Sequence, residues 1–325
     1  MEFIICDADR MEVMPLPETA EIDFDIGDTN DVQITCSKSL LDFGMYVICP
    51  GTEYGALLEE ASSTTSESTE KWLGNAFRHF LQELIIEPPS GEDYRVVSGD
   101  AHDILHSLLD GAFDNMFTIP AEESGIYISS YQFDRYTDAL TGIQKMLNQA
   151  SARIQIEILQ GGTNEPFSVR LSAVPVQNLS EEIEYSEDAK ISITIQESRR
   201  GINHLICLGK GELKDRQVLH LYAQLDGSIS EKQYYSGLAE RTAVYDYSSA
   251  EDLDALKTSG IERLQSLMSS KSMTMSVRDV DMQIGDIIAG RSYEAGLKLQ
   301  KPIVQKIVKI SGGDAEIQYK VEGEE

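Results

Sequence analysis

Two histidines four residues apart, His102 and His106 in the stretch HDILH, have the type and spacing of a zinc-binding motif. On a helix they share one face, where two imidazoles can bind one metal ion and an acid between them can act as a base. The acid here is Asp103, one methylene shorter than the usual glutamate. The histidines also lie away from the apolar stripe of their segment, which favours a solvent or interface face. A metal-dependent hydrolase stays the enzymatic alternative.

The glycine-rich stretch CLGKGELKD, residues 207–215, has the composition of a phosphate-binding loop but not its spacing. A P-loop needs four residues between its glycines followed by Lys-Ser/Thr, and a dinucleotide fingerprint needs three glycines that lead into a helix. Here Gly209 and Gly211 are one residue apart, and residues 217–223 are rich in strand formers. We therefore expect a hairpin, with strands over 204–208 and 217–223.

His204 and His220 fall on these two strands, with Glu212 and Asp215 nearby in the sequence. No serine in the sequence stands in a G-x-S-x-G turn that would make it a nucleophile. A hydrogen-bonded structural role for the two histidines is favoured, and a proton-transfer site stays an open alternative.

The acidic stretch DFDIGDTND is similar in composition to a calcium-binding loop. Its Gly27 stands one position too early for an EF-hand, and no glutamate closes the loop at position twelve. We expect a hairpin turn here instead.

The charge balance excludes the usual ways of binding nucleic acid. The 325 residues hold 27 basic and 55 acidic side chains, a net charge of −28, whereas phosphate binding needs clustered Lys and Arg. The acid is concentrated at the start, because residues 1–150 hold 28 acidic and 7 basic side chains. Such a surface repels DNA and anionic membranes and keeps a protein soluble.

The four cysteines, Cys6, Cys36, Cys49 and Cys207, lack the spacing of a metal site or a disulfide framework, which predicts free thiols in a reducing compartment. The N-terminus lacks a basic region followed by an apolar stretch, and no segment approaches the ~20 apolar residues of a membrane span. We expect a soluble protein made in a cytoplasm, without membrane insertion.

Strand patterns dominate both ends of the chain. In residues 21–26 (EIDFDI) the apolar and acidic side chains alternate without exception, as in a half-buried strand. Further strands are predicted over the remaining alternating or β-branched segments, namely 154–158, 167–174, 190–197, 273–277, IGDII, IVQKIVKI and EIQYKV. The polar stretch 61–70 is expected to be an exposed loop.

Helix patterns lie between the strands. Residues 98–111 predict a short helix with Asp100 as its cap, and residues 137–150 predict a second. The longest helix is expected over 250–269, with Ser248 and Glu251 as a capping box. The run after Trp72, LGNAFRHFLQELII, has helix-like spacing with a β-branched end. The fold class is therefore α+β and mainly β, with barrels as one possible form.

Five stretches together resemble siphophage tail proteins from Gram-positive hosts, of the kind similar to the hub of contractile-phage baseplates. They are GTEYGALLEE (51–60), IIEPPSGEDYRVVSGDAHDIL (85–105), RRGINHLICLGKGELKDRQVLHLYAQLDG (199–227), YDYSSAEDLDALKTSGIERLQSLM (245–268) and IGDIIAGRSYEAGLKLQKPIVQKIVKI (284–310). The resemblance extends from about residue 45 to the end of the chain.

The resemblance implies a structural protein that forms a homotrimer, in which each subunit supplies two tube-like β-barrels to a pseudo-sixfold ring. By that analogy residues 1–97 form the first barrel and 98–185 an inserted α+β domain. Residues 186–240 and 272–325 form the second barrel, which a helical segment over 241–271 interrupts. The sequence ends with VEGEE directly after the hub-like region, so we expect no fused wall hydrolase.

The resemblance also implies the partners. A hub ring contacts the tail tube or distal tail protein on one side and a tail tip or spike protein on the other. The tape measure protein and DNA pass through its channel, and DNA is not bound specifically. Such a protein is a component of the virion tail, of a phage or a phage-tail-like particle, and is assembled in the bacterial host cytoplasm.

No catalytic, cofactor-binding or metal-binding residues are implied, so the expectation is that the protein is not an enzyme. An acidic lumen would let DNA slide where a basic one would hold it. We expect much of the surplus acid of residues 1–150 to face the channel. A tail-associated cell-wall hydrolase that uses His102, Asp103 and His106, and a receptor-binding tail tip protein, are the alternatives.

Overall fold

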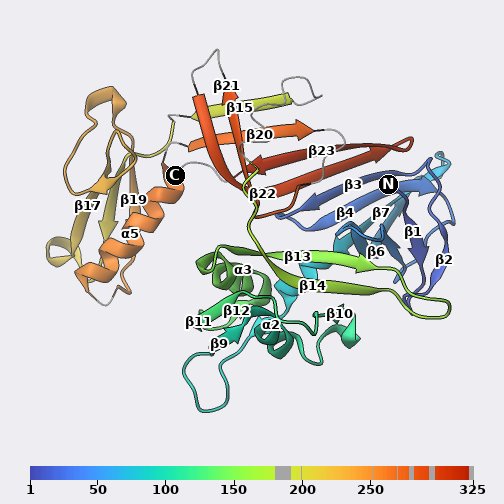
Figure 1. The fold of residues 1–325 in the computed structure, drawn as a ribbon. Helices are drawn as coiled ribbons and strands as arrows, with labels where there is room; N and C mark the ends of the chain where they lie inside the picture. The colour runs from blue at the N-terminus through green and yellow to red at the C-terminus, as the bar shows by residue number, and fades with distance from the viewer. Residues whose placement is uncertain are drawn as a thin grey trace. The chain divides into compact units, whose positions relative to one another are not determined.

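The computed structural model describes residues 1–179, 192–198, 200–250, 252–268, 270–277, 282–292 and 297–321. Contacts between residues divide the chain into two compact units. The large unit comprises Met1–Ile193 and Thr274–Val321, and the small unit comprises Thr194–Met273. Figure 1 shows many strands in the large unit, and a small sheet with one long helix in the small unit.

A twelve-stranded sheet is the largest element. Its strands are β1 (Ile4–Cys6), β2 (Glu12–Pro15), β3 (Glu21–Ile26), β4 (Asp31–Ser37), β5 (Tyr46–Ile48), β6 (Gly55–Ser63), β7 (Thr69–Ala76), β15 (Ser192–Ser198), β20 (Ser270–Val277), β21 (Ile287–Ser292), β22 (Leu297–Ser311) and β23 (Asp314–Val321). The order is β15-β20-β23-β22-β3-β4-β7-β6-β5-β1-β2, with β21 on β22. Because β22 pairs with β3, the end of the chain joins its beginning in one sheet (Figure 1).

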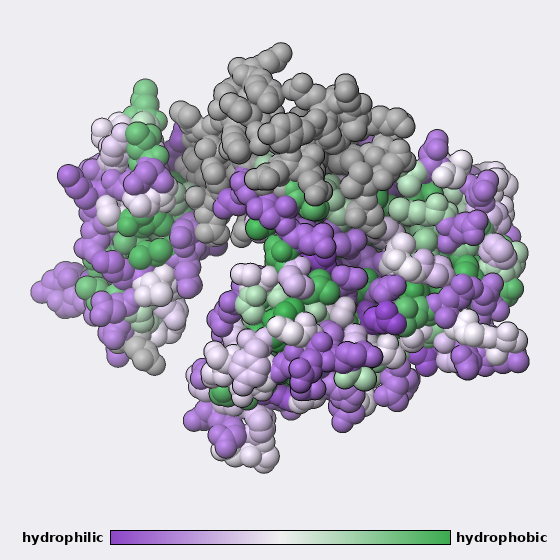
Figure 2. All heavy atoms as spheres, viewed as in Figure 1, coloured by the Kyte–Doolittle hydropathy of each residue, from purple (hydrophilic) through white to green (hydrophobic). Residues whose placement is uncertain are grey.

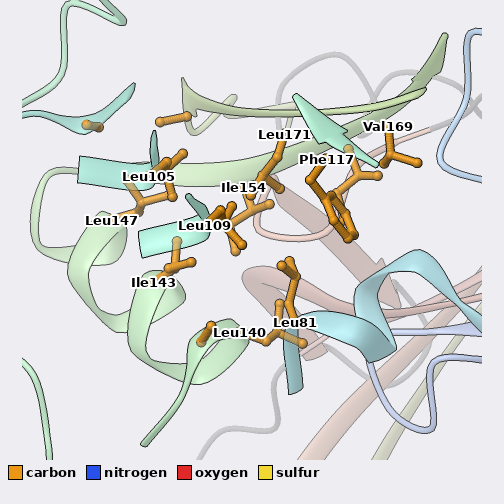
Figure 3. Packing of buried hydrophobic residues seen from close by; sticks show 14 of the residues in the cluster. Leu81, Leu105, Leu109, Phe117, Leu140, Ile143, Leu147, Ile154, Val169 and Leu171 are labelled. Carbon is orange, nitrogen blue, oxygen red and sulfur yellow. The ribbon is translucent and has the colours of Figure 1, made fainter. Parts of the chain in front are cut away.

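Between β7 and β15 the chain forms the α+β part of the large unit. Its elements are α1 (Phe77–Glu83), β8 (Ile85–Ile86), β9 (Val96–Asp100), α2 (Ala101–Leu109), a 3-10 turn (Phe113–Asn115), β10 (Phe117–Thr118), β11 (Tyr127–Gln132), β12 (Thr137–Asp138), α3 (Ala139–Gln149), β13 (Ala152–Leu159) and β14 (Ser168–Pro175). Three helices and the β13–β14 hairpin enclose one apolar core. Figure 3 shows Leu81 of α1, Leu105 of α2 and Ile143 of α3 converging with Ile154 and Leu171 of the hairpin.

The small unit is a four-stranded sheet covered on one face by a helix. Its elements are β16 (His204–Leu208), a 3-10 turn (Leu213–Asp215), β17 (Val218–Ala223), β18 (Ile229–Ser230), a second 3-10 turn (Gly237–Ala239), β19 (Thr242–Asp246) and α5 (Leu253–Leu267), with strand order β18-β17-β16-β19. Leu205, Cys207 and Leu221 pack against Leu256 of the helix. The helix approaches closely because it presents Gly260, where an added Cβ would lie 2.6 Å from Cys207 Sγ.

Several predictions made from local patterns are confirmed. Asp100 caps α2 by accepting a hydrogen bond from the His102 N–H. Helix α3 buries Leu140, Ile143, Met146 and Leu147. The alternation in EIDFDI buries one face of β3, and the next residues form a hairpin turn in which Asn30 Oδ1 accepts from Gly27 N–H. All four cysteines are buried free thiols.

Three predictions are corrected. Strand β7 extends to Ala76, so only the middle of LGNAFRHFLQELII, Phe77–Glu83, is helical, and its β-branched end forms β8; pairing with β4 and β6 on both sides of β7 overrides the helical spacing. Strands β6 and β7 extend into the predicted loop 61–70, as an exposed hairpin. The cap of α5 is Asp252, which accepts from Ala255 N–H at 2.8 Å, and not Ser248.

The fold is α+β and mainly β, as predicted. In the described ranges the large sheet is an open path of strands and no sheet closes into a barrel. Strands β16 to β18, within predicted segment 186–240, share a sheet and a core with β19 and α5 of predicted segment 241–271. The predicted division into four parts stays a prediction. Among the described helices, none has the length and apolar composition to cross a bilayer.

Candidate functional surface

The two histidines of HDILH lie in different environments. His102 is 9% exposed, and its Nδ1 lies 2.8 Å from the Glu122 carbonyl oxygen, so the ring ties α2 to the loop before β11. His106 and Asp103 are exposed on the same helix. Within the described residues no group of three His, Cys, Asp or Glu side chains is arranged to hold a metal ion.

The glycine-rich stretch is a hairpin connection, as predicted. Gly209 N–H donates to the Gln217 carbonyl and Gln217 N–H donates to the Lys210 carbonyl, which continues the β16–β17 ladder into the turn. Arg216 Nε donates to the Gly209 carbonyl oxygen and Gly211 has a φ of +107°. All of these bonds lie within the hairpin itself.

His204 and His220 do come together, on the face of the small sheet opposite α5. His204 Nε2 lies 2.8 Å from His220 Nδ1, and His204 Nδ1 lies 2.8 Å from a carboxylate oxygen of Glu240. The ring of Tyr222 stacks on His204 at 4.2 Å. Burial lowers the pKa of His204 and the neighbouring His220 lowers it further, against the opposing effect of Glu240. The neutral, hydrogen-bonded form is favoured, which fits the structural role predicted for this pair.

One face of the large sheet carries a group of carboxylates. Along β3 and β4 the apolar side chains point to the core, so the alternate residues point to the opposite face. Strand pairing aligns Asp23 with Gln33, Asp25 with Asp31, and Gln33 with Leu73 of β7. We call this surface the acidic face; its carboxylates are Glu21, Asp23, Asp25, Asp31, Glu59 and Glu60.

The acidic face keeps most of its negative charge. Lys309 of β22 lies 3.7 Å from Asp23, with both side chains about half exposed, a separation at which attraction is weak in water. Gln305 Nε2 donates to Asp25 at 2.6 Å and Asn75 Nδ2 donates to Glu59 at 2.6 Å. Each amide satisfies one carboxylate oxygen without neutralising the charge, and Asp25 Oδ1 is buried with no hydrogen-bond partner among the described residues. The result is an anionic surface on β3, β4 and β6, and on β7 the exposed Lys71, which pairs with Thr35, adds one positive charge to the same face.

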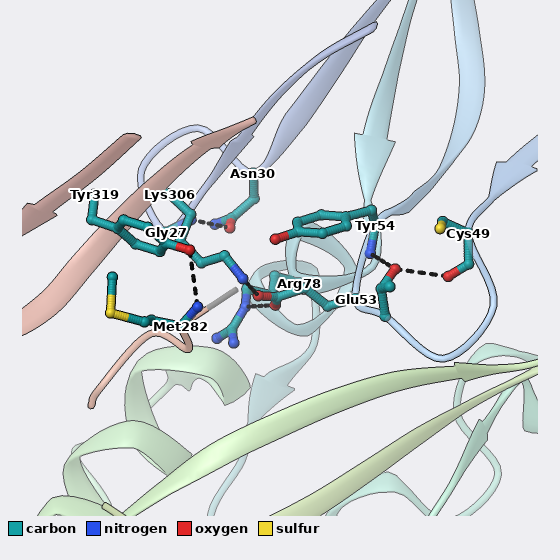
Figure 4. A network of polar contacts seen from close by, with 10 residues as sticks. Gly27, Asn30, Cys49, Glu53, Tyr54, Arg78, Met282, Lys306 and Tyr319 are labelled. Carbon is teal, nitrogen blue, oxygen red and sulfur yellow. Dashed lines mark hydrogen bonds and ion pairs between the residues drawn. The ribbon is translucent and has the colours of Figure 1, made fainter. Parts of the chain in front are cut away.

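A buried charge cluster lies on the opposite side of the same strands (Figure 4). Glu53, from the loop between β5 and β6, contacts Arg78 Nε of α1 at 2.8 Å and Lys306 Nζ of β22 at 3.1 Å. All three side chains are at most 3% exposed. Burial alone would raise the pKa of Glu53, but the charges of Arg78 and Lys306 outweigh it and hold the pKa at about 2. The cluster fixes β22 against the N-terminal strands that carry the acidic face.

Sequence reasoning missed this cluster. Glu53 and Lys306 are 253 residues apart, so no local motif contains both. One signal was available, because the alternation of IVQKIVKI places Lys306 on the same side as the buried Val308 and Ile310. A lysine in the buried phase of a strand indicates a buried partner of opposite charge.

A cavity of about 260 Å³ lies beside the β1–β2 hairpin. Its lining includes Cys6, Phe167, Arg10, Glu12 and the glycine pair of the β13–β14 loop. Gln160 Nε2 donates to Glu12 at 2.8 Å, and both residues also line the cavity. The residues of HDILH do not line this cavity, so the enzymatic alternative gains no substrate cleft from it.

Comparisons with known proteins rest on structure, since no protein-family model and no curated protein sequence matches the chain. The 43 kDa tail protein of prophage MuSo2 from Shewanella oneidensis is similar with a TM-score of 0.54 at 11% identity, over 99% of this chain and 98% of that one. A chain of the p2 virion baseplate in its activated conformation is similar with a TM-score of 0.54 at 11% identity, over 100% and 99%. The chain thus has the fold of phage and prophage tail and baseplate proteins.

Proposed function

We propose that this protein is a structural hub of a phage tail or phage-tail-like particle. Three copies form a pseudo-sixfold ring that joins the tail tube or distal tail protein to the tail tip or spike. The ring leaves a channel through which DNA and the tape measure protein pass. Its place is the virion tail, after assembly in the cytoplasm of the bacterial host.

The extent of the structural likeness carries this proposal. Both similar tail proteins are covered almost from end to end, and so is this chain. A shared module within otherwise different proteins would leave part of one chain unmatched. The fold alone does not determine a role, so the proposal draws its further support from surface chemistry.

The large sheet supplies what a tube-like module needs. Its N-terminal strands β1 to β7 and its C-terminal strands β20 to β23 are two antiparallel sets that meet where β22 pairs with β3. We propose that each set supplies one of the two tube-like modules, so that three subunits present six. Sheet edges in such a ring are covered by neighbouring subunits, because open edges otherwise aggregate.

The acidic face is the surface we assign to the channel. A DNA phosphate backbone binds wherever Lys and Arg displace its counterions, and it is repelled by fixed carboxylates. On β3 and β4 four carboxylates stand on the polar face, and neither strand carries a lysine or arginine. Such a lining would let DNA pass without being held.

Immunogold labelling of purified tails tests the proposal. With an antibody to this chain, gold is expected at the tip-proximal end of the tail tube, one cluster per particle. Label on the head, or no label on intact and disrupted tails alike, would refute the hub assignment. Zymography on host peptidoglycan tests the hydrolase alternative, since a clearing zone that His102→Ala abolishes would make the protein an enzyme.

A further inference from the structure

Two loops of the small unit expose large apolar side chains at one end of its sheet. They are residues 224–228, between β17 and β18, and residues 231–241, between β18 and β19; we call them together the tip. Leu238 is 103% exposed, Leu225 is 73% exposed and Tyr234 is 52% exposed. Figure 2 shows hydrophobic side chains, in green, at the upper end of this unit. Side chains this apolar and this exposed mark interaction sites when they gather on one surface.

Strand register places both loops at the same end. His204, the first residue of β16, pairs with Tyr222 near the end of β17 and with Thr242 at the start of β19. The loop that leaves β17 and the loop that enters β19 therefore both lie beside the start of β16. Leu225 and Leu238 therefore lie at the same end of the sheet although they are separated in the chain.

Asn203 holds the bases of both loops. Its side-chain Nδ2 donates to the Ala239 carbonyl at 2.8 Å, and its Oδ1 accepts from Arg241 N–H at 2.8 Å. Its backbone N–H donates to the Arg241 carbonyl, and its carbonyl accepts from Ala223 N–H. Asn203 is 8% exposed, so these four bonds form in a site shielded from water.

The other ends of the loops are fixed as well. Gln224 Nε2 donates to the Lys232 carbonyl at 2.8 Å and to Ser230 Oγ at 3.0 Å. Asp226 accepts from the N–H and the hydroxyl of Ser228, which closes the shorter loop. Lys257 of α5 contacts Glu231 at 2.6 Å. Hydrogen bonds and one ion pair within the small unit thus hold both loops, while Leu225 and Leu238 stay exposed.

We propose that the tip is a pre-organised docking element, which inserts Leu238 and Leu225 into an apolar recess of a different protein of the same particle. Burying an exposed leucine contributes about 2 kcal/mol, and a loop already fixed in its bound form loses little entropy on binding. This inference rests on the proposed tail function, because it takes the partner from the particle.

The charge of the tip supports a protein partner over the other occupants. Within residues 224–241 three carboxylates face two cations, Lys232 and Arg241, so the tip is nearly neutral in a chain of net charge −28. An anionic bilayer would be repelled by the rest of the chain. The fitting partner presents an apolar recess with a polar, uncharged rim.

A photo-cross-linking residue placed at position 238 in assembled tails tests the docking role. The matched control is position 213, because Leu213 is 94% exposed in the connection at the opposite end of the same sheet. After irradiation of purified tails, position 238 is expected to join a different tail protein, identified by mass spectrometry, at least tenfold more than position 213. A cross-link to a second copy of this chain, equal yields at both positions, or no product at either would overturn the proposal.

Charge substitutions give a second readout. Leu238→Asp should lower co-purification of the cross-linked partner about tenfold, a loss equivalent to about 1.4 kcal/mol, whereas Leu213→Asp should leave it unchanged. An unchanged thermal unfolding curve for both variants shows that the small unit stays folded. If the chain is absent from tails, the hub proposal and this one fail together. If it is present in tails but Leu238→Asp has no effect, only the docking proposal fails.

Discussion

At the scale of single residues, the charges of Glu53, Arg78 and Lys306 are removed from water, and the Glu53 carboxylate contacts both cations. Lys306 also lies 4.8 Å from the centre of the Tyr54 ring, which adds a cation–π contact. A charge buried in this way is stable only while its partners remain. The cluster therefore makes the packing of β22 on the N-terminal strands depend on one carboxylate.

Glu53→Gln should lower the free energy of unfolding by about 3–5 kcal/mol, because it removes the carboxylate that both buried cations contact. Chemical denaturation followed by circular dichroism measures the change. The matched control is Asp23→Asn, which removes a half-exposed partner of Lys309 and should change stability by at most about 0.5 kcal/mol. Equal losses in the two variants would contradict the cluster's role.

The same carboxylate predicts a pH dependence. The pKa of Glu53 lies at about 2 in the folded protein, below its ordinary value of 4.5, so its contribution to stability is complete above pH 4.5 and is lost as the pH falls toward 2. The difference in stability between the natural protein and Glu53→Gln should therefore shrink across that window. Denaturation at a series of pH values between 2 and 7 measures it. A constant difference would show that Glu53 does not titrate there.

At the scale of elements, local patterns predicted those parts of the fold that local forces determine. Helices α2 and α3 each combine a capping aspartate with one apolar stripe, which predicts a helix. The strict alternation of apolar and acidic side chains in β3 predicts a half-buried strand. The boundary between β7 and α1 was missed because Leu73 and Phe77 fit helical spacing, while the strand is decided by pairing with distant β4 and β6. The acidic face was likewise not predictable from local patterns, because its carboxylates lie on separate strands and only the strand register brings them together.

The cap of α5 gives a prediction for this scale. Asp252→Ala should lower the stability of the small unit by about 1 kcal/mol, since the Ala255 N–H loses its acceptor. Ser248→Ala should have no measurable effect, although a capping-box pattern in the sequence points to Ser248. Thermal unfolding of the two variants compares them directly. A larger loss for Ser248→Ala would mean that the helix begins earlier than the structure shows.

The packing of β22 on the turn after β3 gives a second prediction at the scale of elements. Gly27 has a φ of +104°, and an added Cβ would lie 2.1 Å from the backbone oxygen of Val304. Gly27→Ala should therefore destabilise the protein by well over about 1 kcal/mol, because strand and turn must separate. Gly51→Ala is the control, since Gly51 also has a positive φ but open space around it, and only the backbone cost of about 1 kcal/mol applies. Similar losses in the two variants would show that β22 does not press on this turn.

At the scale of the whole molecule, the hub proposal assigns a function to the excess of acidic side chains in residues 1–150. Exposed carboxylates anywhere on the surface keep a protein soluble, whereas only carboxylates on the acidic face would repel DNA in the channel. The position of the carboxylates therefore distinguishes a channel lining from a role in solubility. Glu21→Lys, Asp31→Lys and Glu60→Lys together should slow DNA release from assembled tails roughly tenfold, and added salt should reduce the effect. Real-time fluorescence of released DNA measures it.

The control for that triple variant carries the same change of net charge on the inserted α+β part, with Glu87→Lys, Glu92→Lys and Glu122→Lys. All three positions are exposed. DNA release from these tails should match that of unmodified tails. If both triple variants slow release equally, net charge and not the acidic face controls the passage of DNA.

Electron cryo-microscopy of the intact tail tests the central claim most directly, because one map reports copy number, position and orientation together. The account predicts three copies of this chain in a ring around the tail axis, with Glu21, Asp31 and Glu60 facing the lumen. A ring with a different number of copies, or one in which these carboxylates lie on the outer rim, would contradict it.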